Sequence, residues 1–395
     1  MIQAAEKRRT IAIAKPSLGE AEAAAAREAI LSGWVTQGPQ VAAFEAEFAR
    51  ATGAKFACAV SNCTTALHLV LHALGVRAGD EVITVSHSFI ATANAIRYCG
   101  GTPVFVDVDP STFNIDPELI ERAISPRTKA IMPVHQMGLP CDLAAVLDIA
   151  TRHGIAVIED AACAIGSEID IRQSSAFERI GRPRGIAACF SFHPRKIITT
   201  CDGGMITTND ESVDQQFRLL RQHAMSVSDA VRHSSSAVVF EAYPVVGFNY
   251  RMTDIQAAVG RVQLSRLEEI LRPRVALAER YTNAIAQIEG LQPPHVPAWA
   301  RPNYQSYPVR VRSSYPISRD HLMQALLERG IGTRRGIMNA HQEDAYRAGG
   351  PWSLPQSETA RDSFVLLPLH HELSHDDQDF IIEQLRFFSI PDING

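Results

Sequence analysis

The sequence lacks the features that mark membrane, nucleic-acid-binding and disulfide-rich proteins. No stretch approaches the roughly 18 uncharged apolar residues of a membrane-spanning helix. No basic block offsets the net charge of −5, so small molecules are the expected partners, with no nucleic acid and no membrane. No apolar segment follows the charged residues Glu6–Arg9, so we expect no secretory signal. The seven cysteines include no C-x-x-C pair, which predicts no metal site and reduced thiols in a cytoplasmic protein.

What the sequence does contain is the composition of a globular protein of 395 residues, with 46% hydrophobic and 21% charged residues. Short β-branched runs alternate with helical patterns between residues 55 and 210, which predicts an α/β fold with an open, mostly parallel seven-stranded sheet. The expected strands are Phe56–Val60, Glu81–Val85, Pro103–Val106, Ala130–Val134, Ile155–Glu159, Ala187–Ser191 and Met205–Thr208. The expected helices between them are Thr65–Leu74, Ile90–Tyr98, Pro117–Ala123 and Leu143–Thr151.

A long helical pattern, Asp254–Ile288, and a proline-rich link separate this region from the C-terminal part. The pattern then restarts with a strand over Tyr304–Val311 and helices over Arg319–Arg329 and Asp376–Phe388. We therefore expect a large domain over residues 1–270 and a smaller α+β domain over residues 271–395, with the boundary inside the long helix.

Chemistry-bearing residues follow the ends of the expected strands, where ligands bind in open α/β sheets. Ser61–Leu67 runs from a strand through small polar residues into a helix, which is typical of a phosphate cradle or of an ordinary N-cap. It has neither the G-x-G-x-x-G nor the G-x-x-x-x-G-K spacing, which disfavours dinucleotide and nucleoside triphosphate sites.

Three further features stand at such strand ends, each with an ordinary alternative. Glu159 and Asp160 form an acid pair at the end of an apolar strand, and one of them needs a cation, strong donors or solvent, although a strand-ending Asp is commonly a helix N-cap. Lys196 follows another apolar strand. A desolvated, electropositive pocket lowers the pKa of a lysine, which then can form a Schiff base, whereas most lysines are solvated surface charges. Phe89 stacks on a planar ring or packs in the core. Together the four features fit pyridoxal 5′-phosphate.

Ordered blocks over nearly the whole length make the chain resemble the DegT/DnrJ/StrS family of sugar aminotransferases, which have the aspartate-aminotransferase (type I) fold. The blocks are Gly33–Pro39, Phe44-Glu45, Gly79–Ile83, Ala91–Ala95, Pro133–His135, Glu159–Ala162, Ser191–Lys196 and Gly247–Ala258.

The resemblance implies a role for each matching residue. Lys196 would be the Schiff-base lysine and proton shuttle, and Asp160 the partner of the cofactor's ring nitrogen. The other implied cofactor contacts are Phe89 on the ring, Thr64, Ser191 and the backbone at Cys63 on the phosphate, and Asn249 of a neighbouring subunit. A homodimer with shared active sites is therefore expected.

The chain departs from the family at three cysteines. Cys63 stands where the family commonly has Gly, Cys163 where it often has Gln or His beside the cofactor, and Cys201 where Gly is usual. These residues lead to the hypothesis of a thiol-lined pocket that binds the cofactor.

Substrate contacts are expected from charged residues on two further segments. The resemblance points to Arg334 and Arg335 for a diphosphate or a donor carboxylate, and to His193 beside the lysine. The segment Ile169–Arg184 carries four arginines and is either a surface loop or a lip that contacts an anionic substrate.

The resemblance thus implies transfer of an amino group from an amino acid, L-glutamate, to a nucleotide-linked 4-keto-6-deoxy sugar, with pyridoxamine phosphate as the intermediate cofactor form. An aminotransferase of a cyclitol or another cyclic ketone fits the same motifs. A sugar dehydratase is disfavoured by the presence of Lys196, and a non-catalytic regulatory relative by the retention of lysine, acid and phosphate residues together.

Overall fold

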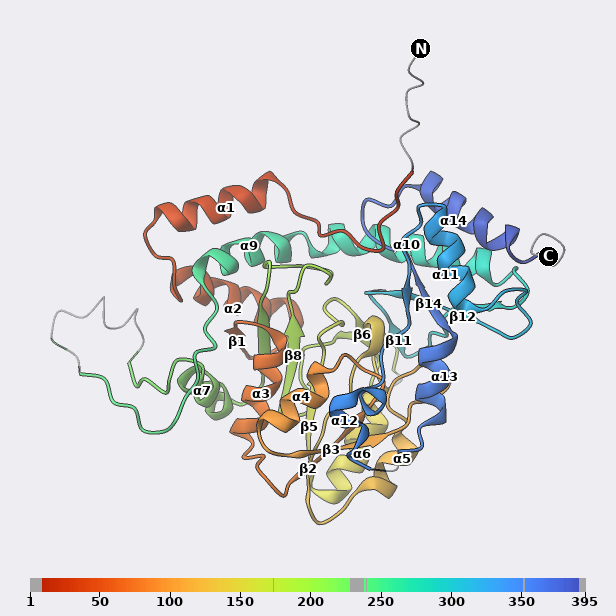
Figure 1. Cartoon of the computed structure of the whole chain (residues 1–395). Helices are drawn as coiled ribbons and strands as arrows, with labels where there is room; N and C mark the ends of the chain where they lie inside the picture. The colour runs from red at the N-terminus through yellow and green to blue at the C-terminus, as the bar shows by residue number, and fades with distance from the viewer. Residues whose placement is uncertain (1–8, 173, 228–237, 239, 351, 391–395) are drawn as a thin grey trace.

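A seven-stranded sheet forms the centre of the computed structural model, which describes residues 9–172, 174–227, 238, 240–350 and 352–390. The strands lie in the order β1-β9-β8-β5-β4-β2-β3 (Figure 1). Their bounds are β1 (Phe56–Val60), β2 (Glu81–Val85), β3 (Thr102–Val106), β4 (Thr128–Ile131), β5 (Ala156–Asp160), β8 (Ala187–Ser191) and β9 (Gly204–Thr208). Only β9 runs antiparallel to its neighbours in this sheet, so the expected mostly parallel α/β sheet is confirmed.

Helices cover both faces of this sheet because its strands alternate apolar residues between two buried sides. In β1, Cys58 and Val60 join one core, whereas Ala57 and Ala59 join the other. The first core includes residues of α3 (Cys63–Ala73), α4 (Ala91–Tyr98) and α7 (Glu211–Leu220). The second includes residues of α2 (Pro39–Thr52), α5 (Pro117–Ala123), α6 (Leu143–His153) and α9 (Asp254–Ser265), and α1 (Glu20–Leu31) packs on α9.

A second sheet and a separate hydrophobic core occupy the C-terminal part of the chain. The sheet is antiparallel, in the order β10 (Leu291–Gln292), β12 (Tyr307–Val311), β14 (Phe364–Leu367) and β13 (Arg334–Arg335). Residues of α10 (Leu267–Ile285), α11 (Arg319–Glu328) and α14 (His375–Phe387) complete this core. Leu271 of α10 belongs to the core of the large sheet and Leu277 to the second core, which supports our proposal of a domain boundary within this helix.

Three elements differ from the sequence-based expectation. The long helical pattern is two helices, α9 and α10, because the backbone leaves helical geometry at Arg266 (φ −96°, ψ 5°). The strand expected from Tyr304 begins only at Tyr307, because Tyr304 has a left-handed φ of 51°. The segment Ile169–Arg184 is not a plain loop: Ile169 and Glu178–Arg179 belong to a small sheet of β6 (Glu168–Ile169), β7 (Glu178–Arg179) and β11 (Ala300–Arg301).

Two short helices, α12 (Asp344–Arg347) and α13 (Pro355–Ser363), pack where the C-terminal part meets the large sheet. Among the described residues, no helix is both long enough and apolar enough to cross a membrane.

Candidate active site

The predicted site residues gather at one edge of the large sheet, where β1, β2, β5 and β8 have their carboxyl ends. Asn62 and Cys63 follow β1, Phe89 follows β2, and Asp160 and Ser191 end β5 and β8. Because these strands are mutually parallel, residues far apart in the sequence arrive at a common edge.

The N-terminus of α3 forms one side of this edge. Asn62 is the N-cap, and its side chain accepts a hydrogen bond of 2.9 Å from the backbone N–H of Thr65. Cys63 and Thr64 are the first two helical residues, so their N–H groups have no partner within the helix. A Cβ atom on Gly204 would lie 2.5 Å from the carbonyl carbon of Asn62, so only glycine allows β9 to pass this close. Ser191 on β8 pairs with Gly204 on β9, so the serine hydroxyl lies at the same edge of the sheet as the N-terminus of α3. The N-cap and anion-cradle interpretations therefore both fit.

Asp160 is a buried carboxylate whose two hydrogen-bond donors are neutral. Its oxygens accept from the hydroxyl of Thr92 at 2.8 Å and from the backbone N–H of Ala162 at 3.2 Å. Burial raises the pKa of Asp160, and these two hydrogen bonds only partly oppose the rise. A cationic partner would restore the lost stabilisation, which fits the ring nitrogen of a bound cofactor.

A buried histidine on the neighbouring strand end fixes the backbone of Asp160. The N–H of His135 donates to the Asp160 carbonyl at 3.0 Å. Its ring Nδ1 accepts from the N–H of Cys141 at 3.1 Å, so Nε2 carries the proton and donates to Glu159 at 3.2 Å. His135 and Glu159 therefore form a buried structural pair in this arrangement.

Lys196 lies in the turn after β8 and reaches towards the turn after β5, where its Nζ donates to the Sγ of Cys163 at 3.0 Å. Burial opposes the charge of Lys196, but Cys163, Cys63 and Asp160 outweigh it and raise the lysine pKa above its usual value. The surroundings of Lys196 are therefore not the electropositive pocket that lowers a lysine pKa. The neighbours are thiols and a carboxylate, and they favour the ammonium form.

Phe89, His193 and Asn249 are all exposed. The ring of Phe89 is 70% exposed at the start of α4, so it is free to cover a ligand rather than being part of the core. His193 stands in the turn that leads to Lys196. Asn249 pairs with the buried Gln222 in an isolated bridge, and the next residue, Tyr250, accepts a hydrogen bond of 2.8 Å from the N–H of Ser61 just beyond β1.

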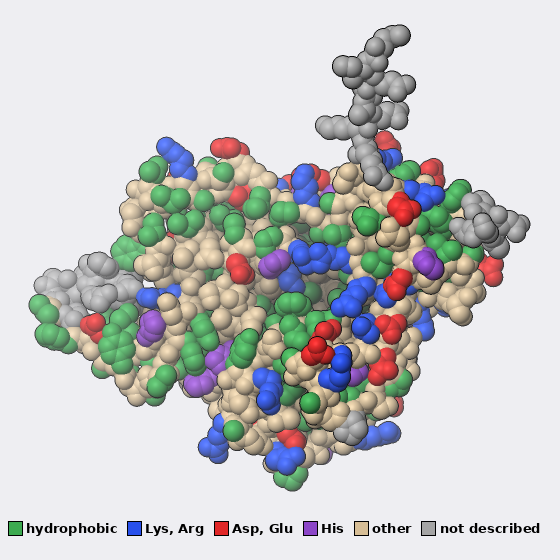
Figure 2. Space-filling model, viewed as in Figure 1, with side chains coloured by type: hydrophobic (Ala, Val, Ile, Leu, Met, Phe, Trp, Pro, Cys, Tyr) green, Lys and Arg blue, Asp and Glu red, His purple; other side chains and the backbone are tan. Residues whose placement is uncertain are grey.

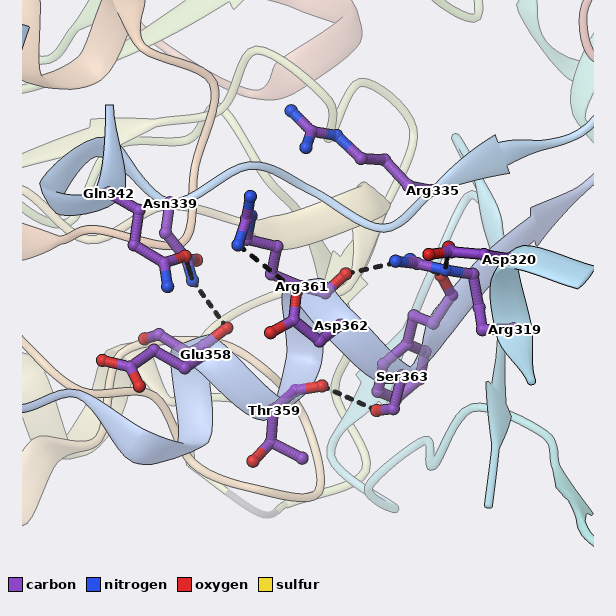
Figure 3. A network of polar contacts seen from close by, with 12 residues as sticks. Arg319, Asp320, Arg335, Asn339, Gln342, Glu358, Thr359, Arg361, Asp362 and Ser363 are labelled. Atoms are coloured by element: carbon purple, nitrogen blue, oxygen red, sulfur yellow. Dashed lines mark hydrogen bonds and ion pairs between the residues drawn. The ribbon is translucent and has the colours of Figure 1, made fainter. Parts of the chain in front are cut away.

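Exposed arginines lie near the edge of the sheet that holds the predicted site residues. Figure 2 shows a hollow near the middle of the drawn face with Lys and Arg side chains along its rim. Partial burial and repulsion by Arg195 lower the pKa of Arg334, which places these two exposed arginines near each other. Arg335 extends away from the network of Arg319 and Arg361 (Figure 3), and its one ion pair with a described residue is with Glu343, at 4.0 Å.

Three of the four arginines of the 169–184 segment are paired with acids. Arg182 and Arg184 both contact Glu178, and Arg179 contacts Glu268. Their charges are thus neutralised on the surface of the β6–β7 sheet, which favours the surface interpretation.

Sequence reasoning missed two residues that contact the site. Thr92 lies one helical turn beyond Ser88, and its hydroxyl connects Ser88 with Asp160. Gln305 accepts from the backbone N–H of Ile197, next to Lys196. A serine four residues before a threonine at a helix start is a weak signal for the first contact, and the sequence holds none for the second.

The sequence and the fold of this chain are similar to those of known proteins. A family model described as the DegT/DnrJ/EryC1/StrS aminotransferase family matches residues 16–386. The aminotransferase TlmJ from Streptoalloteichus hindustanus is 36% identical over 96% of this chain and 98% of its own, with a TM-score of 0.87. Spr1654 from Streptococcus pneumoniae, in its PMP form, is 27% identical over 96% and 99%, with a TM-score of 0.89. DesI, solved in the presence of its TDP-sugar product, is 28% identical over 98% and 94%, with a TM-score of 0.86.

Proposed function

The chain belongs to the DegT/DnrJ/EryC1/StrS aminotransferase family, and we propose that it transfers the amino group of L-glutamate to a nucleotide-linked 4-keto-6-deoxy sugar. The observation that carries the proposal is the meeting of Lys196, Asp160 and the N-terminus of α3 at one edge of the sheet. The TDP-sugar product of DesI and the PMP form of Spr1654 support the class of substrate and cofactor.

The residues present fit pyridoxal 5′-phosphate as the cofactor. The free N–H groups of α3 and the hydroxyls of Thr64 and Ser191 suit the phosphate. Asp160 is a buried carboxylate without a cationic hydrogen-bond donor, which suits a protonated ring nitrogen. Exposed Phe89 suits the ring face, and Lys196 suits the aldehyde carbon. When bound, the cofactor supplies an aldehyde that takes up the donor's amine and a ring that draws electrons from the reacting carbon.

The protein's own groups then move and hold protons. Lys196 Nζ would take the α-proton of glutamate and give it up again in the same half-reaction, a shuttle of a kind that contributes roughly 10²–10⁴-fold. Asp160 would hold the ring nitrogen of the bound cofactor in its protonated form. Thr92 and the N–H of Ala162 hold the carboxylate of Asp160 in place while this occurs.

The substrates require positive charge at the mouth of the site. Arg195 and Arg334 are exposed neighbours of equal charge, and an anionic group between them would relieve their repulsion. We assign them to the diphosphate of the sugar nucleotide or to the donor's side-chain carboxylate, with His193 beside them.

We further propose a cytoplasmic homodimer with shared active sites. Asn249 is exposed and follows a surface segment with the exposed apolar residues Phe240, Tyr243 and Val246, which suits an interface with a second copy. All seven cysteines are free, which suits a reducing compartment. Light scattering tests the dimer: a monomer at assay concentration would contradict it.

Borohydride reduction in the presence of pyridoxal 5′-phosphate, followed by peptide mapping, tests the role of Lys196. The chain has five lysines, so peptide mapping distinguishes an adduct at Lys196 from adducts at the exposed Lys15, Lys55 and Lys129. Lys196→Ala should abolish both adduct and turnover, whereas the control Lys129→Ala should keep both. An unmodified Lys196 in cofactor-loaded protein would refute the proposal.

The substrate class is tested with protein loaded with pyridoxamine phosphate. Nucleotide keto-sugars and cyclic ketones are offered separately, and the products are analysed by mass spectrometry. A new amino group on a nucleotide sugar supports the proposal. Amination of cyclitol ketones alone would replace it.

A further inference from the structure

A glutamine from the C-terminal part of the chain, Gln305, forms hydrogen bonds with the backbone on both sides of Lys196. The Gln305 Oε1 atom accepts a hydrogen bond of 3.0 Å from the N–H of Ile197. Its Nε2 atom donates to the carbonyl of Arg195 at 2.5 Å. The two bonded peptide groups flank Lys196, so the amide of Gln305 restrains the backbone that carries the lysine side chain.

Gln305 is itself held by neighbouring groups. Its N–H donates to the side chain of Asn303 at 2.8 Å. The buried guanidinium of Arg274 donates to the carbonyls of Tyr304 and Gln305 at 2.8 and 3.1 Å. The glutamine therefore projects from a fixed backbone, which lowers the entropic cost of keeping its side chain in one orientation.

The same segment also holds the turn that carries the partner of Lys196. The side-chain Nδ2 of Asn303 donates to the carbonyls of Cys163 and Ile165, both at 2.8 Å. The two turns that meet in the contact between Lys196 Nζ and Cys163 Sγ are thus both tied to residues 303–305.

We propose that Gln305 is a positioning residue that sets the location of Lys196 Nζ through its two backbone hydrogen bonds. The proposal rests on the proposed function of Lys196 as the proton shuttle. A shuttle must stand within about 0.5 Å of its productive position, and a displacement of about 1 Å costs roughly 10²-fold in rate. Gln305 acts through the backbone alone and needs no contact with substrate.

Two variants separate the two bonds, and one serves as a control. Gln305→Leu removes both bonds. Gln305→Glu keeps the acceptor for the Ile197 N–H but replaces the donor to the Arg195 carbonyl with an oxygen. Gln292→Leu is the control, because Gln292 is a half-buried glutamine of β10 whose side chain contacts only Arg312 among the described residues.

The first readout is hydrogen exchange of the Ile197 amide, measured by NMR on cofactor-free protein. We expect at least tenfold faster exchange in Gln305→Leu, with amides of the large-sheet core unchanged, and near-native exchange in Gln305→Glu and Gln292→Leu. This measurement does not depend on enzyme activity, so it tests the two backbone hydrogen bonds of Gln305 even if the chain proved to have another function.

The second readout is steady-state kinetics of the loaded enzyme. We expect kcat to fall about 10- to 100-fold in Gln305→Leu, with an intermediate fall in Gln305→Glu and KM for the amino donor changed less than about threefold. Unchanged Ile197 exchange would overturn the proposal, as would faster exchange with unchanged kcat. A rise in KM alone would mark Gln305 as a substrate contact instead, and accelerated exchange throughout the core would mark it as merely structural. If Gln305→Leu does not fold, Gln305→Met provides the same test with a side chain of similar length.

Discussion

Asp160→Asn is expected to affect activity and stability in opposite directions. The substitution keeps the size of the side chain but removes its charge, so a protonated ring nitrogen would lose its partner. Breaking a buried ion pair from one side costs about 3–5 kcal/mol. At about 1.4 kcal/mol per factor of ten, kcat should fall roughly 10²- to 10⁴-fold.

The cofactor-free form of the same variant should be more stable than the wild type at pH 7. The new amide oxygen still accepts from the Ala162 N–H, and the new amide nitrogen donates to the Thr92 hydroxyl, which turns towards Ser88. Relief of the buried charge should add about 1–2 kcal/mol, or a few degrees in Tm.

The pH dependence of this stability follows from the raised pKa of Asp160. The folded protein holds the proton more tightly than the unfolded chain, so its stability falls as pH rises from the ordinary carboxyl pKa through the raised one. The variant and the wild type should be equally stable at low pH and differ fully above the raised pKa. Calorimetry of cofactor-free protein at several pH values measures this difference.

Asp170→Asn provides a matched control, because Asp170 is also buried and its two oxygens accept from the N–H groups of Ser174 and Ser175. It lies in the β6–β7 connection and should leave kcat unchanged. A kcat of Asp160→Asn within tenfold of the wild type, or a lower Tm of its cofactor-free form at pH 7, would refute the reasoning.

Three further predictions concern stability, cofactor capture and the thiols. Glu45→Gln should cost about 3–5 kcal/mol in urea unfolding, because it leaves buried Arg221, 2.5 Å from the carboxylate, without its counter-charge; a loss under 1 kcal/mol would contradict this. Capture of added pyridoxal 5′-phosphate, followed by absorbance, should speed up about tenfold per pH unit above pH 7, because the pKa of Lys196 is raised and only its neutral amine reacts; a pH-independent rate would contradict it. Thiol alkylation should slow the enzyme, with protection by bound cofactor and resistance in Cys163→Ser; absence of protection would end the thiol-pocket hypothesis.

The large sheet was predictable because each of its strands is a short apolar run followed by a turn signal. Parallel strands then bring their carboxyl ends to one edge, so Asp160 and the N-terminus of α3 follow from local sequence alone. The bounds shifted by one to three residues where neighbouring chain segments decide the pairing. β4, for example, begins at Thr128 because it pairs with β2 from Glu81 onward.

What the sequence could not reveal are the contacts between distant segments. Gln305 is 108 residues from Ile197, and no local pattern marks a glutamine whose partners are two backbone groups elsewhere. The role of the arginines in the 169–184 segment stayed open for a related reason. Whether their charges are free to bind an anion depends on Glu178 and Glu268, and Glu268 belongs to the distant helix α10. Charge on a segment predicts an anion site only when no acid within reach neutralises it.

The charge balance of the pocket explains how one lysine can be an ammonium ion before cofactor binding and a base afterwards. Cys163, Cys63 and Asp160 raise the pKa of Lys196, and Asp160 is the carboxylate among these three; burial raises the pKa of the Cys63 thiol itself well above the usual value. A cationic ring nitrogen on Asp160 would compensate the negative charge that favours the lysine proton. Under the proposed function, Asp160 paired with the ring nitrogen would favour the proton of Lys196 less, so cofactor binding would lower the lysine pKa towards the range where it acts as a base.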